Sequence, residues 1–262
     1  MNHTQHTTAE NSVQVLNRAG TSPVVLVCEH ASSRIPEVFG NLGLRDSDLK
    51  SHAAWDPGAL AVAQGMSSRL DATLVAGKVS RLVYDCNRPP EAPDAMPSRS
   101  EMIQIPGNAE LTLSQRQDRA TTYYEPFRAC LADTLGQKPA PVVVTIHSFT
   151  PVYNGHRRDV EIGILHDADS RLADAMLGAA KAHCAFNVRR NDPYGPKDGV
   201  THTLKEHALP FDRQNVMIEI RNDLIATPGQ QDAMALTLSN WLADAFAQTQ
   251  SPGGPAPSGG GA

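Results

Sequence analysis

Long apolar runs and a secretory leader are both missing from this sequence. No stretch approaches the roughly 20 apolar residues that a membrane-spanning helix needs. The first residues, MNHTQHTTAENSVQ, have neither the positive start nor the apolar centre of a signal peptide. We therefore expect a cytoplasmic protein that has no membrane partner.

Cysteine is scarce, and basic residues do not cluster. The four cysteines are widely spaced, with no CxxC pair for a structural zinc site and no dense pattern for a disulfide scaffold. The formal net charge is −5 at pH 7, and no run of Lys or Arg provides the basic face that phosphate binding needs. These absences argue against a disulfide-stabilised module and against a nucleic-acid-binding protein.

The composition that remains is that of an ordinary globular protein, with 262 residues of which 40% are hydrophobic and 19% charged. Residues 1–20 are polar and aperiodic, and residues 248–262 are rich in Gly, Pro and Ser, so we expect both ends to be flexible. No linker or internal repeat divides residues 21–247, which we expect to form one domain.

Short apolar runs alternate with stretches of helical period along this domain. Strands are predicted at 24–27, 73–76, 81–85, 142–146, 160–165 and 215–220. Helices are predicted at 57–70, 114–135, 169–184 and 229–246. Because the strands are nearly all apolar, both faces of the sheet should be covered. The pattern predicts an α/β fold with a mainly parallel or mixed sheet between helices.

Polar residues follow several of these runs, at the sheet edge where α/β proteins bind ligands. They are Glu29-His30, Asn87-Arg88 and His147-Ser148, and the last strand carries Glu219 and Arg221. Taken singly, a histidine could be structural, Asn87-Arg88 an ordinary turn, and Glu219 with Arg221 an internal ion pair. Two imidazoles, a carboxylate and an arginine at one edge are together the parts of a hydrolytic metal site.

A carboxylate is needed to complete a His/His/carboxylate ligand set, which leaves one zinc position open for water. Asp56, just before the helix at 57–70, is one candidate, although it could instead cap that helix. Glu29 is the rival. Because neighbours on a strand point to opposite faces, Glu29 and the adjacent His30 should diverge unless the chain bends. Asp56 is therefore the preferred ligand.

These residues together resemble the N-formylglutamate amidohydrolase family, which is related to the zinc carboxypeptidases and aspartoacylases. The resemblance extends from about residue 24 to residue 246. It rests on the order and spacing of CEHASSRIP at 28–36, AAWDPGA at 53–59, SRLVYDCNRPP at 80–90, TIHSFTP at 145–151, RRDVEIGILHD at 157–167, NDPYGPKDGVTHTLKEHA at 191–208 and NVMIEIRNDLI at 215–225. It implies a single three-layer α/β/α catalytic domain of the zinc carboxypeptidase type, with one zinc ion per chain.

The resemblance also implies roles for individual residues. His30 and His147 correspond to the two histidine ligands, and Glu219 to the general base. Asn87-Arg88 resembles the pair that holds a substrate carboxylate, and Arg81 the arginine that polarises the scissile carbonyl. The sequence departs from the His-x-x-Glu ligand pattern of carboxypeptidases, because Ser33 stands at the third position after His30.

Further substrate contacts are predicted outside the strand ends. The polar segment 153–159 is either a solvated loop or a lid in which Arg157 or Arg158 recognises a second acidic group. His202 either lines the pocket or faces water at a helix start. Arg221 is a further substrate-binding candidate. The remaining histidines, His52 among them, are assigned no functional role, and a surface role is the simpler interpretation.

The sequence thus predicts a zinc-dependent amidohydrolase that removes a formyl or other small acyl group from an N-acyl amino acid. The acyl group and the amino acid are left open. A carboxypeptidase-like peptidase and an inactive amino-acid-binding homologue are the alternatives. The expected partner is the small-molecule substrate, with neither nucleic acid nor a membrane, and the protein should be a monomer or a small homo-oligomer.

Overall fold

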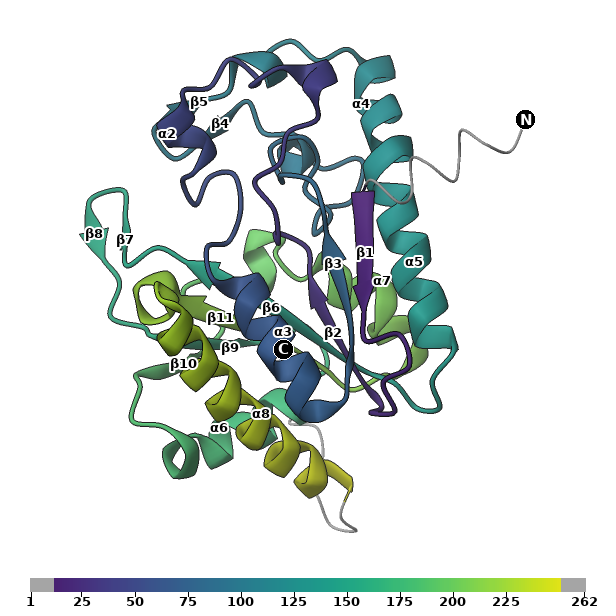
Figure 1. Ribbon diagram of the computed structural model, residues 1–262, viewed down its shortest axis with the longest axis vertical. Helices are drawn as coiled ribbons and strands as arrows, with labels where there is room; N and C mark the ends of the chain where they lie inside the picture. The colour runs from purple at the N-terminus through teal and green to yellow at the C-terminus, as the bar shows by residue number, and fades with distance from the viewer. Residues whose placement is uncertain (1–11, 251–262) are drawn as a thin grey trace.

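The computed structural model describes residues 12–250 and contains a seven-stranded mixed sheet (Figure 1). Its strands, in spatial order, are β1 (Val13–Leu16), β3 (Thr73–Gly77), β2 (Val24–Cys28), β6 (Val142–Phe149), β11 (Asn215–Arg221), β9 (Ile162–Leu165) and β10 (Val188–Arg190). Two short hairpins lie outside the sheet: β4 (Arg99–Ser100) with β5 (Ile103–Gln104), and β7 (Val152–Tyr153) with β8 (His156–Arg157).

The four central strands β3, β2, β6 and β11 are parallel to one another. Strands β1 and β9 are antiparallel to their neighbours, and β10 is parallel to β9. The carboxyl ends of β2, β6 and β11 therefore meet at one edge of the sheet. Side chains that follow these strands are brought together there, although more than 100 residues separate β2 from β6.

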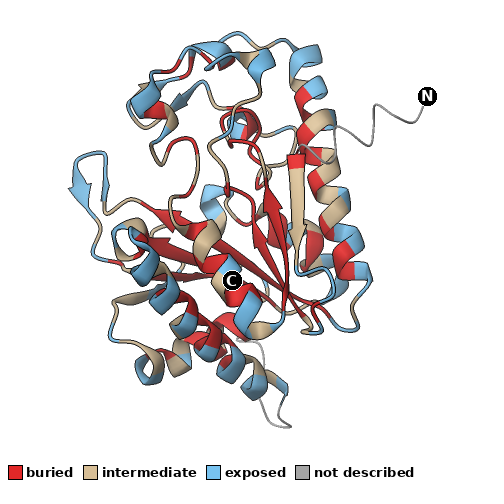
Figure 2. Ribbon diagram, viewed as in Figure 1, coloured by how far each residue is buried: buried red, intermediate tan, exposed pale blue. Residues whose placement is uncertain are grey.

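Helices cover both faces of the sheet. The helices are α2 (Asp46–Leu49), α3 (Ala59–Leu70), α4 (Leu113–Arg119), α5 (Glu125–Gly136), α6 (Arg171–His183), α7 (His202–His207) and α8 (Pro228–Gln250), with a π-helical turn over Ala120–Tyr124 between α4 and α5. One apolar core joins α3, α6 and α8 to the sheet, and another joins α5 and α7 to its opposite face. Figure 2 shows buried strands and helices with exposed outer faces. This three-layer arrangement confirms the predicted fold class.

Local sequence explains how two of the helices begin. Thr112 and Gln115 form a reciprocal capping box at the start of α4, and Pro228 occupies the first position of α8, where its missing N–H costs nothing. The indole of Trp241 on α8 donates to the backbone carbonyl of Met176 on α6, at 2.7 Å, which links the two helices over one face of the sheet.

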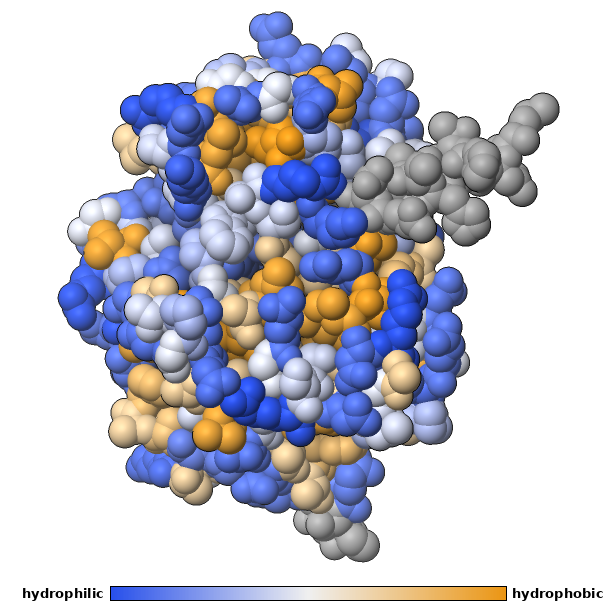
Figure 3. All heavy atoms as spheres, viewed as in Figure 1, coloured by the Kyte–Doolittle hydropathy of each residue, from blue (hydrophilic) through white to orange (hydrophobic). Residues whose placement is uncertain are grey.

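A third apolar core lies in a cap built mainly from loops between residues 35 and 124. Leu82, Tyr84, Met96 and Ile105 are almost completely buried in it, and the Tyr84 ring stacks on Tyr124 at 5.4 Å between centroids. In Figure 1 the cap is the upper part of the molecule, around β4 and β5. Figure 3 shows apolar side chains gathered on this part and near the middle of a mainly hydrophilic face.

Most predicted strands and helices are present, but the strand predicted at 81–85 is wrong. These residues form turns, because Leu82, Val83 and Tyr84 are buried by the cap and not by neighbouring strands. An apolar run of three residues, Leu82 to Tyr84, does not distinguish these two environments. The structure also adds β10 and α7, and the predicted helix 114–135 contains the π turn.

The predicted flexible N-terminus of residues 1–20 is wrong for residues 13–16, which form β1 and pair with β3. The predicted flexible tail at 248–262 begins within α8, which ends at Gln250. Residues 1–11 and 251–262 lie outside the described part of the chain. Between residues 12 and 250, no helix combines the length and apolarity needed to cross a membrane.

Candidate functional site

A cavity of about 500 Å³ lies where β2, β6 and β11 end. Its walls include His30 after β2, His147 near the end of β6 and Glu219 near the end of β11. The cap contributes Arg81 and Asp85 to the same cavity. The predicted convergence of polar residues at this sheet edge is therefore present in the structure.

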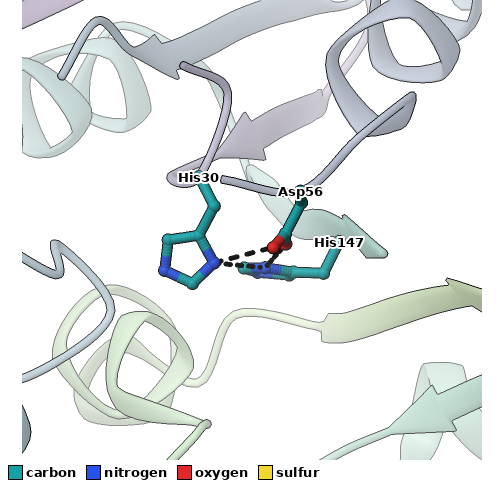
Figure 4. Close-up of side chains that lie close together, drawn as sticks. All are labelled: His30, Asp56 and His147. Carbon is teal, nitrogen blue, oxygen red and sulfur yellow. Dashed lines mark hydrogen bonds and ion pairs between the residues drawn. The ribbon is translucent and has the colours of Figure 1, made fainter. Parts of the chain in front are cut away.

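His30, Asp56 and His147 point toward one another and are buried (Figure 4). Asp56 Oδ2 lies 3.3 Å from His30 Nδ1 and 3.1 Å from His147 Nδ1, and the two Nδ1 atoms are 3.3 Å apart. The Asp56 backbone N–H also donates to the His30 carbonyl at 2.9 Å, which ties the two segments together. The structure thus brings three potential metal ligands from three separate segments to one point.

These separations fit a tetrahedral metal ion. Ligand atoms about 2.0–2.1 Å from a tetrahedral zinc lie about 3.3 Å from one another, and the three observed separations are 3.1–3.3 Å. Two imidazole nitrogens that face each other at 3.3 Å have no hydrogen bond to share when both carry lone pairs. A cation between them would satisfy both nitrogens and the carboxylate at once.

Each imidazole has a carboxylate at its other nitrogen. His30 Nε2 lies 2.7 Å from Asp85 Oδ1, and His147 Nε2 lies 3.2 Å from Glu29 Oε2. Because a carboxylate only accepts, a neutral His30 ring bonded to Asp85 carries its hydrogen on Nε2 and keeps its lone pair on Nδ1. Glu29 is at ion-pair distance from His147 Nε2, but neither of these two atoms has a hydrogen-bond partner within residues 12–250.

Asp56 and Glu29 differ in where their oxygens lie, and only Asp56 is grouped with both imidazoles as a potential metal ligand. Glu29 is directed to the far side of the His147 ring, and its Oε1 accepts from Thr203 Oγ1 at 2.5 Å. Asp56 does not cap α3, whose N-cap is Gly58 without a side-chain hydrogen bond.

The turn between Asp56 and α3 requires glycine at position 58. Gly58 has a φ of 84°, and a Cβ there would lie 2.6 Å from the Ile225 carbonyl, so only glycine fits this turn.

Asp85 was not identified from the sequence, where it was taken as the end of a strand. Replacing it with asparagine should weaken zinc binding about 10- to 100-fold, because the amide does not hold the His30 ring as a carboxylate does. Competition with a zinc-chelating dye measures this affinity. Asp94→Asn is the matched control, because Asp94 lies in the same cap segment but pairs with Arg88. Equal affinity in Asp85→Asn and the wild type would contradict this role.

The buried charges around the triad are predominantly negative. Burial alone would raise the pKa of the Asp56 carboxyl, but Arg81 and His30 hold it well below its usual range. The charge of His30 likewise lowers the pKa of Asp85 against the effect of burial. With neutral imidazoles, these anions lack sufficient positive charge nearby, and either protonated histidines or a divalent cation would balance them.

Arg81 lies directly beside the triad. Its Nη1 is 3.1 Å from His30 Nδ1 and 3.2 Å from Asp56 Oδ1. Its Nη2 donates to the His52 carbonyl at 2.7 Å and lies 3.1 Å from His52 Nε2. His52 lines the cavity, although the sequence assigned it no functional role. Burial, followed by the charge of Arg81, lowers the pKa of His52 to about 3, which keeps the ring neutral as an acceptor for Arg81.

Glu219 faces His147 across adjacent strands, because the two residues are register partners in β11 and β6. Its Oε2 is buried and has no hydrogen-bond partner within residues 12–250. Burial raises the pKa of Glu219 to about 7, against the lowering charge of His147. The carboxyl is thus able to exchange a proton near neutral pH.

Asn87 and Arg88 line the cavity, but their polar groups are engaged by protein atoms. Asn87 Nδ2 donates to the Val200 carbonyl at 2.5 Å, and its Oδ1 accepts from the backbone of Thr203. Arg88 Nε donates to Asp94 at 2.7 Å, and Nη1 donates to the Gly199 carbonyl at 3.0 Å. These side chains hold the 199–203 segment against the cap.

Of the four remaining residues predicted to contact the substrate, only Arg158 lines the cavity. Arg158 lines the cavity, whereas Arg157 is exposed on β8 outside it. His202 is bonded to the Tyr124 hydroxyl at 2.7 Å and does not line the cavity. Arg221 is buried and pairs with Asp223 and Glu161, so the internal ion pair with Glu219 considered from the sequence is not formed.

The chain is similar to several known proteins over most of its length. The model of the N-formylglutamate amidohydrolase family matches residues 22–226. The crystal structure of gene product Atu2144 from Agrobacterium tumefaciens is similar over 94% of this chain and 98% of that one, with 54% identity and a TM-score of 0.91. An N-formylglutamate amidohydrolase from Ralstonia eutropha JMP134 shares the fold over 90% of this chain and 99% of that one, with 19% identity and a TM-score of 0.57. No curated protein matches the chain.

Proposed function

Because this chain belongs to the N-formylglutamate amidohydrolase family, we propose that it is a zinc-dependent amidohydrolase acting on N-acyl amino acids. The reaction removes a formyl or other small acyl group by adding water to the amide. The supporting observation is the set of three ligand atoms 3.1–3.3 Å apart, in a cavity that also contains the unpartnered carboxyl of Glu219.

His30, Asp56 and His147 would hold the metal. Two imidazole nitrogens and one carboxylate oxygen form a donor set that suits zinc and leaves a fourth position open. Zinc bound there would lower the pKa of a water molecule and polarise the substrate carbonyl as a Lewis acid. Asp85 and Glu29 would keep the two imidazoles in the tautomer that this binding requires.

Glu219 would act as the general base and then the general acid. It would accept a proton from the attacking water and deliver it to the departing amide nitrogen, which leaves as an amine. Its raised pKa of about 7 supports both steps, because the carboxyl gains and loses a proton with little free-energy change at neutral pH.

Arg81 would stabilise the negative charge that develops on the carbonyl oxygen. Its guanidinium is positioned by His52, and losing one donor of this kind typically costs about 3–4 kcal/mol of transition-state stabilisation. The neutral His52 ring accepts from Arg81 without adding a second positive charge. Arg81 and His52 would therefore work as one unit.

Activity should depend on the metal and on a free substrate carboxylate. Zinc-loaded protein is expected to release amine from N-formyl-L-glutamate or another N-formyl or N-acetyl amino acid, to lose this activity with zinc on dialysis against a chelator, and to regain it when one zinc per chain is restored. Metal analysis by mass spectrometry and an amine assay measure both quantities.

The same assay separates the alternatives. Cleavage of unmodified peptides in preference to N-acyl amino acids would indicate a peptidase. Tight binding of an N-acyl amino acid without amine release would indicate an inactive binding protein. Full activity in protein shown to be free of metal would contradict the zinc-dependent mechanism.

A further inference from the structure

Arg158 lies at the wall of the cavity in a pocket of aromatic rings. Its guanidinium carbon is 4.5 Å from the centroid of Tyr153, 4.8 Å from that of Tyr194 and 5.5 Å from that of Phe149. Tyr153 and Tyr194 line the cavity together with Arg158. Such cation–π contacts partly replace the water that a buried guanidinium gives up, but they provide no counter-ion.

Arg158 differs from the other two arginines of the cavity in having no anionic partner among residues 12–250. Arg81 lies 3.2 Å from Asp56, and Arg88 lies 2.7 Å from Asp94. The Arg158 Nη1 atom, in contrast, is buried and has no hydrogen-bond partner in the described chain. Leaving such a donor unsatisfied is costly unless a ligand completes it.

The backbone carbonyl of Arg158 is fixed by a side chain that lies outside the cavity. Arg221 Nη1 donates to the Arg158 carbonyl at 3.2 Å, while Arg221 itself pairs with Asp223 and Glu161. The guanidinium of Arg158 is therefore presented to the cavity from a fixed backbone position. This gives the buried Arg221, which does not reach the cavity, a positioning role.

We propose that Arg158 is the residue that binds the α-carboxylate of the N-acyl amino acid, in place of the Asn87-Arg88 pair. This assignment rests on the proposed function. Asn87 and Arg88 already donate hydrogen bonds to the backbone of residues 199–200, and Arg88 also pairs with Asp94. The Nη1 group of Arg158, in contrast, has no acceptor within residues 12–250. A guanidinium binds a carboxylate through two parallel N–H groups, which fixes the orientation of the substrate.

The α-carboxylate is the group expected there because of its place in the substrate. Only one carbon separates it from the scissile nitrogen, so its binding site must lie in the same cavity as the reacting groups. Glu219 and Arg158 both line this cavity, and the charges of both act on the Tyr194 hydroxyl. Tyr194, on the wall of the same cavity, is thus within electrostatic reach of both groups.

Three substrates test the assignment: N-formyl-L-glutamate, its α-carboxamide and its γ-carboxamide. Wild-type protein should prefer the acid over the α-carboxamide. Arg158→Gln should lower kcat/KM for the acid about 100-fold, mainly through KM. It should leave kcat/KM for the α-carboxamide unchanged to within about twofold, since that substrate has no carboxylate to lose. Arg158→Lys keeps the charge but not the fork, and should fall between the two.

Arg157→Gln is the matched control, because the neighbouring Arg157 is exposed and lies outside the cavity. Its selectivity should equal that of the wild type. Retained preference for the free α-carboxylate in both Arg158 variants would overturn the assignment. The assignment would also be overturned if the Arg158 variants lost only the discrimination between the acid and its γ-carboxamide. The same holds if Arg88→Lys, and neither Arg158 variant, lost the discrimination between the acid and its α-carboxamide.

A binding measurement separates this inference from the proposed function. In zinc-loaded Glu219→Gln protein, calorimetry should detect N-formyl-L-glutamate binding that weakens about 100-fold when Arg158→Gln is added. This loss of binding would support the carboxylate site whether or not the wild type releases amine. Absence of amine release by the wild type would contradict only the proposed reaction. Equal binding with and without Arg158 would overturn the carboxylate site even in an active enzyme.

Discussion

Glu219→Gln is expected to lower kcat about 10²- to 10⁴-fold while zinc content stays at one ion per chain. Glutamine has nearly the shape of glutamate but does not accept the proton of the attacking water. Within residues 12–250, the Oε2 of Glu219 has no hydrogen-bond partner, and Glu219 is not one of the three grouped metal-ligand candidates, so its replacement should leave His30, Asp56 and His147 in place. Single-turnover kinetics and metal analysis on the same sample measure the two quantities.

Glu206→Gln is a suitable control for this change. Glu206 is a partly exposed acid that pairs with Arg128 outside the cavity, so its loss should leave kcat unchanged. Unchanged turnover in Glu219→Gln would remove Glu219 as the base. Loss of zinc together with turnover would indicate instead that Glu219 is a metal ligand.

His147→Ala is expected to abolish activity by removing a ligand from the centre of the site. If a binding free energy of about 10–16 kcal/mol is shared among four ligands, each contributes about 3–4 kcal/mol, and zinc affinity should fall by about 10²- to 10³-fold. The change also leaves Asp56 and Glu29 without their shared partner, so thermal stability of the metal-free protein should decrease as well.

His207→Ala controls for the loss of a buried imidazole. His207 is buried on α7 and takes no part in the triad, so this variant should lose stability but keep its zinc affinity. Equal zinc affinity in His147→Ala and His207→Ala would contradict the role of His147. A stability loss in both, with a loss of zinc only in His147→Ala, is the expected pattern.

Part of the site could be predicted from the sequence because strand patterns are local. The buried runs that form β2 and β6 end next to His30 and His147, and parallel strands bring their carboxyl ends to one edge. Glu219 followed from the same logic, since it is a buried acidic residue near the carboxyl end of a mainly apolar strand. The family resemblance added the assignment of roles.

The remaining site residues depend on packing between distant segments. Asp85 reaches His30 because its turn is held by the cap, where its backbone N–H bonds to Ala95. His52 is drawn into the cavity by Arg81, 29 residues away. The engagement of Asn87 by Val200 spans 113 residues, and no local pattern predicts it. Contacts of this kind decide which of several plausible arginines is left to bind a substrate.

The central claim is that His30, Asp56 and His147 hold one divalent ion. Crystals of zinc-loaded protein, measured above and below the zinc absorption edge, test it most directly. A single anomalous peak in contact with His30 Nδ1, His147 Nδ1 and the Asp56 carboxylate is the predicted result. The absence of a peak there, or a peak bound through Glu29 or the Nε2 atoms, would contradict the claim.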